Sequence, residues 1–311
     1  MKSWLSWLLA TLVIAYLLYA HWRDQPPGDV TIPALHTHDR YGTQPLDQYR
    51  EFEAFVSSFD GADDDNGDGI PDTLGIPQWV AYQISRYEGD IESSKRPRSW
   101  ATDNALYKAG LAPRDETYRY SRDFRSTHPN FYVRGHLAMK YHAERIGHTA
   151  ARETHTLLNA VPQREQFNRG IWLDMECLTG AWANQYGAVW IVTGPVFYER
   201  QPKEWIGERE KDERLAAVPD ALFKVVIKDS GDPQRPDVLA FVYPQEDAAY
   251  GNKPYLHERF LVSVDRVEAL TGLDFLTKLK KEDRAEIEAK LSEGLWAVSA
   301  VFFTEACKHN R

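Results

Sequence analysis

A long apolar run at the N-terminus constrains this chain more than any other feature. Residues 4–22 read WLSWLLATLVIAYLLYAHW, nineteen residues without Asp, Glu, Lys or Arg. A helix of that length spans about 28 Å, close to the hydrocarbon thickness of a bilayer, and the aromatic rings near both ends suit the membrane interfaces. We therefore predict a transmembrane signal anchor over residues 1–22, with the body of the protein exported to the periplasm or the extracellular medium.

A cleaved signal peptide is the alternative interpretation of this segment. Cleavage requires small residues three and one positions before the cut, and Leu18 before Ala20 fits that requirement poorly. A cleaved chain is secreted rather than anchored, and the sequence leaves both alternatives open.

Residues 23–92 are expected to form a linker and a small acidic helical module. Residues 23–45 carry four prolines and no hydrophobic period, which is typical of a linker. Apolar residues at helical spacing predict a helix over residues 46–58, and a second helix is predicted to begin at Pro77.

The acidic loop of this module, residues 60–72, predicts a calcium site. It contains a D-x-N-x-D-G-x-x-D pattern, with a glycine at the turn and oxygen-bearing side chains at Asp64, Asn66, Asp68 and Asp72. This spacing suits a structural Ca²⁺, and the loop resembles those of thrombospondin type 3 repeats, although Gly75 replaces the last ligand of an EF-hand loop. A solvated acidic turn without an ion is the alternative.

Residues 93–311 are predicted to form one α+β domain. Apolar runs predict strands over residues 189–198, 223–229 and 238–244. Helical patterns follow around residues 264–280 and 281–294. The irregular alternation of strands and helices favours a mixed or antiparallel sheet over a doubly wound one.

Positive charge is concentrated at the start of this domain. Residues 95–170 include fourteen basic and seven acidic residues, a net charge of +7, whereas the whole chain carries −9. The whole-chain charge excludes a histone-like polycation. The local excess is mostly arginine, whose planar guanidinium binds phosphate oxygens in pairs, so it predicts a surface for a polyanion.

Three side chains in this basic segment match the needs of phosphodiester hydrolysis. His136 suits a general base that deprotonates water near neutral pH, and Arg134 suits the negative charge of the transition state. The carboxamide of Asn168 can anchor a Mg²⁺ ion that keeps most of its waters. Glu176, two helical turns later, is expected to hold the waters of that ion rather than the ion itself.

Each of these residues has an ordinary explanation when taken alone. A single histidine is more often structural than catalytic, and an asparagine at the start of a helix is more often its cap. The prediction therefore depends on their combination. His142, His148 and His155 are expected to be structural or exposed, because their spacing does not make a shared metal face with His136.

The combined spacing resembles that of the DNA/RNA non-specific endonucleases, a family of His-Me finger (ββα-metal) nucleases. The segments RGH, LLNAVPQ and FNRGIWLDME match the family pattern D-R-G-H, then N-x-x-P-Q, then N-x-G-x-W with a later Glu. The resemblance covers roughly residues 95–306. It implies a ββα finger and a metal-dependent enzyme that cuts DNA and RNA to 5′-phosphorylated products, with Mg²⁺ or Mn²⁺ as cofactor.

The resemblance also implies a role for each matching residue. Its catalytic residues are His136 as general base, Arg98 and Arg134 as phosphate clamps, Asn159 as the brace of the finger, and Glu176. Asn168 is the implied metal ligand, and Glu176 acts on the metal through water. Nucleic acid is the implied partner of Arg98, Arg134 and Arg169.

Two points stay open in the sequence. The family aspartate before Arg-Gly-His is Val133 here, so activity is expected to be lower or differently regulated if that carboxylate supports its neighbours. Cys177 and Cys307 either form a disulfide in an oxidising compartment or remain buried thiols. The alternative function is a non-catalytic surface module that holds nucleic acid, and no protein partner is predicted.

Overall fold

The structure is a computed structural model that describes residues 37–45, 48–61, 73–118, 132–208, 213–246, 250 and 253–308. The predicted membrane segment and the predicted calcium ligands Asp64, Asn66, Asp68 and Asp72 lie outside the described residues. Within those residues, no helix has the length and the apolar character needed to cross a membrane. The residues from Thr37 onward form one compact unit.

A seven-stranded sheet forms the centre of this unit, and every pair of neighbouring strands in it is antiparallel. Its strands, in spatial order, are β1 (Gln48–Glu51), β2 (Val56–Phe59), β3 (Trp79–Ser85), β6 (Ala188–Val196), β9 (Ala221–Lys228), β10 (Asp237–Pro244) and β11 (Leu261–Val262). The α+β fold with an antiparallel sheet and the three predicted strands are confirmed.

The helical module predicted within residues 23–92 is wrong. Residues 48–59 form β1 and β2, and the segment after Pro77 forms β3, which pairs with β6 in the sheet. Val80 and Ile84 are four residues apart, so they share a face in a strand as well as in a helix. β3 is buried along nearly its whole length, and a strand buried on both faces does not show the alternating pattern. The predicted boundary after residue 92 therefore cuts through the sheet.

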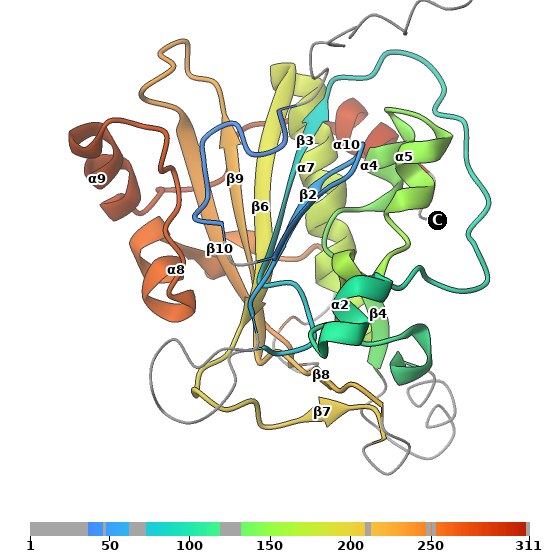
Figure 1. The fold of residues 1–311 in the computed structure, drawn as a ribbon. Helices are drawn as coiled ribbons and strands as arrows, with labels where there is room; N and C mark the ends of the chain where they lie inside the picture. The colour runs from blue at the N-terminus through green and yellow to red at the C-terminus, as the bar shows by residue number, and fades with distance from the viewer. Residues whose placement is uncertain are drawn as a thin grey trace, which may run out of the picture. The chain divides into compact units, whose positions relative to one another are not determined.

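Helices cover both faces of the sheet (Figure 1). One face packs against α8 (Val264–Thr271) and α9 (Lys281–Ala289). The other packs against the long α7 (Leu173–Tyr186), beside which lie α4 (Lys140–Glu144), α5 (His148–Glu153) and α10 (Ala300–Ala306). The helix expected over 264–280 ends at residue 271, because Gly272 adopts a left-handed conformation with φ 72°.

A smaller unit projects from the α7 face. β4 (Tyr132–His136) and β5 (Ala160–Arg164) form a two-stranded antiparallel sheet. The chain then continues through α6 (Glu165–Phe167) and a π-helical turn, η4 (Asn168–Trp172), into α7. Two strands followed by a helix are the arrangement expected for a ββα finger.

Short elements complete the described structure. They are α2 (Asn104–Ala109), η1 (Asp115–Tyr118), η3 (Leu157–Asn159), η7 (His257–Phe260), β7 (Trp205–Ile206) and β8 (Ala216–Ala217).

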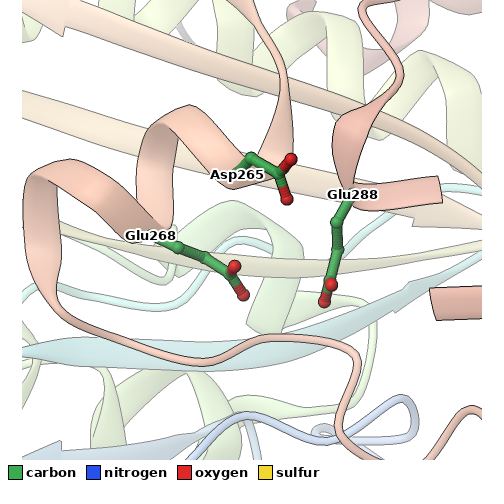
Figure 2. Close-up of side chains that lie close together, drawn as sticks. All are labelled: Asp265, Glu268 and Glu288. Carbon is green, nitrogen blue, oxygen red and sulfur yellow. The ribbon is translucent and has the colours of Figure 1, made fainter. Parts of the chain in front are cut away.

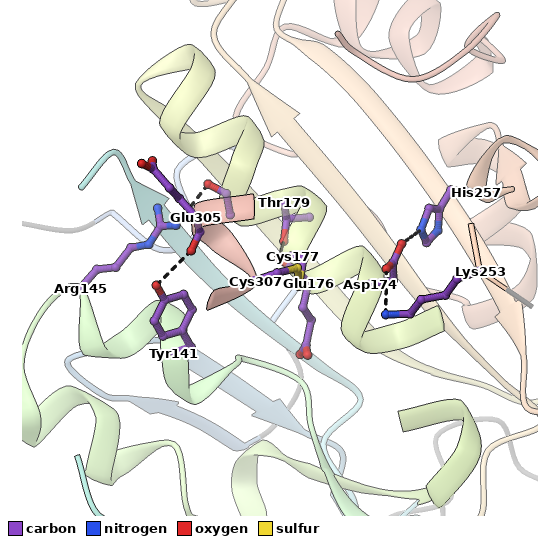
Figure 3. The surroundings of a disulfide bond; sticks show 11 residues. Tyr141, Arg145, Asp174, Glu176, Cys177, Thr179, Lys253, His257, Glu305 and Cys307 are labelled. Atoms are coloured by element: carbon purple, nitrogen blue, oxygen red, sulfur yellow. Dashed lines mark hydrogen bonds and ion pairs between the residues drawn. A yellow bond between two sulfur atoms is a disulfide. The ribbon is translucent and has the colours of Figure 1, made fainter. Parts of the chain in front are cut away.

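A disulfide joins α7 to the C-terminal helix. Cys177 and Cys307 are bonded, with their Cα atoms 5.2 Å apart, so the structure has the paired state of the two alternatives (Figure 3). The adjacent Tyr141 hydroxyl lies 3.5 Å from the carbonyl oxygen of Glu305. The C-terminal helix is thereby attached to the helix that carries Glu176.

Candidate active site

A cavity of about 780 Å³ opens between the finger and α4. Five of the residues predicted from the sequence line it: Arg134, His136, Asn168, Arg169 and Glu176. They come from β4, from the turn η4 and from α7, so the fold brings together residues that are up to 42 positions apart. The predicted base and the predicted metal ligand share one cavity.

His136 is the last residue of β4, and the backbone around it is firmly held. It pairs with Ala160 of β5, and its carbonyl oxygen accepts a hydrogen bond from the indole Nε1 of Trp172 at 3.3 Å. The next residue, Leu137, donates its backbone N–H to the Asn159 carbonyl at 3.0 Å. The strand therefore ends at a fixed point beside α7.

The side chain of Asn159 braces the backbone that follows His136. It is fully buried, and its Oδ1 accepts the backbone N–H of Ala138 at 2.7 Å. Its Nδ2 donates to the carbonyl oxygens of Ala138 and Thr154, both at 2.9 Å. Asn159 does not reach the cavity, so it acts on the site through the backbone.

The imidazole of His136 is held in its neutral form. Its Nε2 is buried and has no hydrogen-bond partner among the described residues, so Nδ1 is the nitrogen available to the cavity. Burial holds the pKa of this imidazole well below its ordinary value, and the nearby cations Arg96, Lys140 and Arg134 lower it further. A neutral imidazole is the form that accepts a proton.

Asn168 presents an oxygen atom to the cavity. Its Nδ2 donates a hydrogen bond to Oε1 of Gln163 on β5, which leaves Oδ1 as the atom available for a ligand. The close approach of Gln163 to β4 depends on Gly135, because a Cβ at that position would collide with the Gln163 side chain. The finger and the turn η4 are thus joined by one side chain.

Glu176 is a buried carboxylate on the wall of the cavity, with 5% of the residue exposed. The pKa of this carboxyl is raised to about 7, because the effect of burial exceeds the lowering by Lys224 and Arg96. Lys224 of β9 is fully buried beneath it, with its Nζ 4.2 Å from the centroid of the Trp172 ring. A cation near Glu176 favours its ionised form, and a bound metal ion would do the same.

Three cations at the cavity each have an acidic partner. Arg134 is ion-paired with Asp115 and lies 5.7 Å from the Trp100 ring centroid. Lys140 is paired with Glu144, and Arg169 lies 3.5 Å from Glu165. These pairs hold positive side chains at the wall of the cavity.

Arg98 is not among the residues that line the cavity, whereas Arg96 is. The segment before Arg96 is attached to α4, because Glu144 accepts hydrogen bonds from Ser94, from its backbone N–H at 2.6 Å and from its hydroxyl at 2.9 Å. Arg96 and Lys140 were not predicted from the sequence. The KRPR run and the excess of basic residues mark the region without saying which residue faces the cavity.

Val133, in place of the family aspartate, also lines the cavity. It lies opposite Gln163 in the finger. The position therefore contributes an apolar wall.

Three carboxylates lie close together elsewhere in the described structure. Oxygen atoms of Asp265, Glu268 and Glu288 lie within 4.8 Å of one another, between α8 and α9 (Figure 2). Glu268 accepts the backbone N–H of Phe275 at 2.8 Å, and Arg284 lies 3.5 Å from Glu288. None of the three carboxylates lines the cavity, and two of them have structural partners.

A neutral imidazole, a carboxamide oxygen and several cations around one polar cavity suit the hydrolysis of a phosphate diester. Their placement on a ββα unit beside an antiparallel sheet is the arrangement expected for a nuclease. Comparison with known proteins leads to the same class.

Residues 41–282 match the family model of the DNA/RNA non-specific endonucleases. The chain belongs to that family. The match begins well before residue 95, the start of the resemblance recognised in the sequence, and so includes β1 to β3.

Similar proteins come from bacteria and eukaryotes. "Nuclease 1, mitochondrial" of Schizosaccharomyces pombe is 32% identical over 58% of this chain and 56% of its own length. "Nuclease" of Serratia marcescens is 29% identical over 70% and 75%, and human "Endonuclease G, mitochondrial" is 26% identical over 77% and 73%. This chain thus spans little more than half of the S. pombe protein.

A solved structure shares the fold. The structure titled as the EndoG/EndoGI complex superposes with a TM-score of 0.62, covering 79% of this chain and 92% of the other at 24% identity.

Proposed function

We propose that this protein is an exported, metal-dependent endonuclease that hydrolyses phosphodiester bonds of both DNA and RNA and leaves 5′-phosphates. One observation carries the proposal: His136 and Asn168, from different elements, line the same cationic cavity. The family supports the class of reaction, and the cavity supports the assignment of residues.

His136 is the proposed general base. Its Nδ1 takes a proton from the attacking water, and the ring is neutral beforehand because burial and nearby cations lower its pKa. Trp172 holds the carbonyl oxygen of His136 and Asn159 holds the backbone of Ala138, so the ring does not need to be reordered for each turnover.

The donor set fits a hard divalent cation, and Mg²⁺ or Mn²⁺ is the proposed cofactor. Asn168 Oδ1 is the proposed direct ligand, and Glu176 is proposed to bind the waters of the ion. When bound, the ion supplies a Lewis acid that neutralises charge on the phosphate and assists the leaving oxygen.

Arginines supply the remaining stabilisation. Arg134 and Arg96 line the cavity and are proposed to bind the scissile phosphate, with Arg169 at the rim for a neighbouring phosphate. Arg98 remains a proposed phosphate contact on the resemblance alone.

The export of the protein and the calcium loop are further parts of this proposal. The Cys177–Cys307 disulfide supports an oxidising compartment, and the N-terminal apolar run supports a membrane anchor or a cleaved signal. A structural Ca²⁺ in the loop of residues 60–72 rests on its sequence pattern.

A nicking assay tests the proposed activity. The full-length chain, purified in mild detergent, is expected to cut plasmid DNA and RNA with Mg²⁺ or Mn²⁺ and to stop on addition of EDTA. Removal of the base by His136→Ala is expected to lower kcat by at least about 100-fold while DNA binding persists. A wild-type chain that binds DNA but leaves it uncut with either metal would support the non-catalytic binding module instead.

A further inference from the structure

A second imidazole lies against the proposed general base. The rings of His136 and His155 are perpendicular, with centroids 5.0 Å apart. The centroid of the Trp100 ring lies 4.5 Å from that of His136 and 5.2 Å from that of His155. His155 comes shortly after α5 and is only 3% exposed. The function proposed above gives this buried histidine no part.

The backbone fixes which nitrogen of His155 carries the hydrogen. Its Nδ1 lies 3.3 Å from the carbonyl oxygen of Ala151, and a carbonyl only accepts, so Nδ1–H is the donor. Burial lowers the pKa of the His155 imidazole to about 4, so the ring is neutral near pH 7. The Nε2 of this ring is therefore a free acceptor.

His136 has the complementary requirement. Because its Nδ1 must be unprotonated to take a proton from water, the hydrogen of the neutral ring lies on Nε2. In the part of the chain that the structure describes, neither this Nε2 nor that of His155 has a hydrogen-bond partner, and both atoms are buried. One buried donor and one buried acceptor thus belong to two rings in contact, and leaving them unpaired is costly.

We propose that His155 is a positioning residue that accepts the Nε2–H of His136 and so keeps Nδ1 of His136 turned to the cavity; this rests on the function proposed above. In the structure the rings meet edge to face and the two Nε2 atoms are not bonded to each other. The proposed bond requires a rotation about the last side-chain torsion, which is soft for histidine. His155 then orients the base His136, as a third side chain does in other sites where a base activates a nucleophile.

The contact also stabilises the proton transfer. The attacking water gives its proton to Nδ1 of His136, and Nε2 keeps its own hydrogen, so no proton passes to His155. The ring becomes an imidazolium, and a charged donor makes the stronger hydrogen bond to His155.

The other groups that act on the charge of His136 do not offer this acceptor. Apart from His155 they are cations: Arg96, Lys140 and Arg134. They oppose the imidazolium, so a neutral acceptor at Nε2 is the contact that favours it.

Two substitutions at one position separate hydrogen bonding from packing. His155→Phe keeps a ring of similar size but removes the acceptor, whereas His155→Gln keeps an acceptor oxygen. His148→Phe, at an exposed histidine of α5, is the matched control. Each full-length variant is compared with wild type for kcat, KM, the pH–rate profile and the melting temperature.

We expect H155F to lower kcat by about 10–100-fold with KM changed less than about twofold. The acid limb of its profile is expected to move to lower pH, because the imidazolium loses its acceptor. H155Q is expected to restore most of kcat, and H148F to behave as wild type. Nitrogen NMR of histidine-labelled wild type is expected to show His136 as the Nε2–H form.

Wild-type kcat and profile in H155F, or an equal loss in H155Q and H155F, would overturn the assignment. If H155F does not fold, the NMR result on wild type decides, because a His136 that carries its hydrogen on Nδ1 excludes the proposed bond. A wild type that cuts, with activity lost in H136A but kept in H155F, rejects only this inference, whereas a wild type that does not cut rejects the proposed function.

Discussion

Asn159 shows how a single side chain fixes the loop that follows the proposed base. All three of its hydrogen bonds go to backbone atoms, at Ala138 and Thr154. Glu144 uses the backbone of Ser94 in the same way to hold the segment that leads to Arg96. Backbone partners have few conformations, so these buried polar groups position the site with little loss of side-chain freedom during catalysis.

One buried carboxyl group makes the free energy of unfolding depend on pH. The pKa of the Glu288 carboxyl is raised from 4.5 to about 7, first by burial and then by the nearby carboxylates Glu268, Asp274 and Asp265, while Arg284 lowers it. The folded state therefore keeps this proton where the unfolded chain has released it. The free energy of unfolding is expected to fall as pH rises from about 4.5 to about 7, and to stay lower above that window.

Glu288→Gln removes this dependence. At pH 8 the variant is expected to be more stable than wild type by roughly 1–3 kcal/mol, and near pH 4 the two are expected to agree. Urea unfolding at both pH values measures the difference. Glu282→Gln, at an exposed residue of the same helix, is the control. An equal gain in E282Q, or a gain in E288Q that is independent of pH, would contradict the assignment.

At the scale of elements, the turn between α6 and α7 places the proposed metal ligand. η4 is a π-helical turn that begins at Asn168, and Gly170 within it has φ −98° and ψ −114°, outside the helical region. A π turn offsets the helix that follows, and such turns are frequent at functional sites. Here it sets Asn168 against Gln163 of the finger.

Gly135→Ala tests this coupling of finger and turn. The added Cβ collides with Gln163, which holds Asn168, so kcat/KM is expected to fall at least about tenfold and the free energy of unfolding by about 1–3 kcal/mol. Gly294→Ala is the matched control, because a Cβ there meets nothing within 4 Å. Nuclease assays and thermal unfolding check both variants, and a G135A enzyme with wild-type kcat/KM would show that the turn does not depend on Gln163.

The same elements show what the sequence predicts and what it does not. The strands β6, β9 and β10 follow from continuous apolar runs, and the His136–Asn168 pair follows from motif spacing. β1 to β3 were mistaken for helices, because residues four apart share a face in either structure. The π turn and the choice of Arg96 for the cavity depend on contacts between distant segments, such as Ser94 with Glu144, which local pattern does not contain.

At the scale of the whole molecule, the disulfide joins α7 to the end of the C-terminal helix α10. Cys177 directly follows Glu176, and its partner Cys307 lies 130 residues later. Closing a loop of that length restricts the unfolded chain, which is worth roughly 2–5 kcal/mol to the folded state. The helix that carries Glu176 is therefore stabilised by its disulfide to the C-terminal helix, in keeping with the export proposed above.

The account depends on His136 and Asn168 acting together on one metal-assisted reaction. The most direct test is a crystal structure of the full chain soaked with Mn²⁺, with anomalous diffraction used to locate the ion. We predict a peak inside the cavity with Asn168 Oδ1 in its coordination shell, Glu176 reaching it through water, and Nδ1 of His136 facing the same space. A cavity peak without Asn168 as ligand, or a His136 ring turned away from it, would contradict the account.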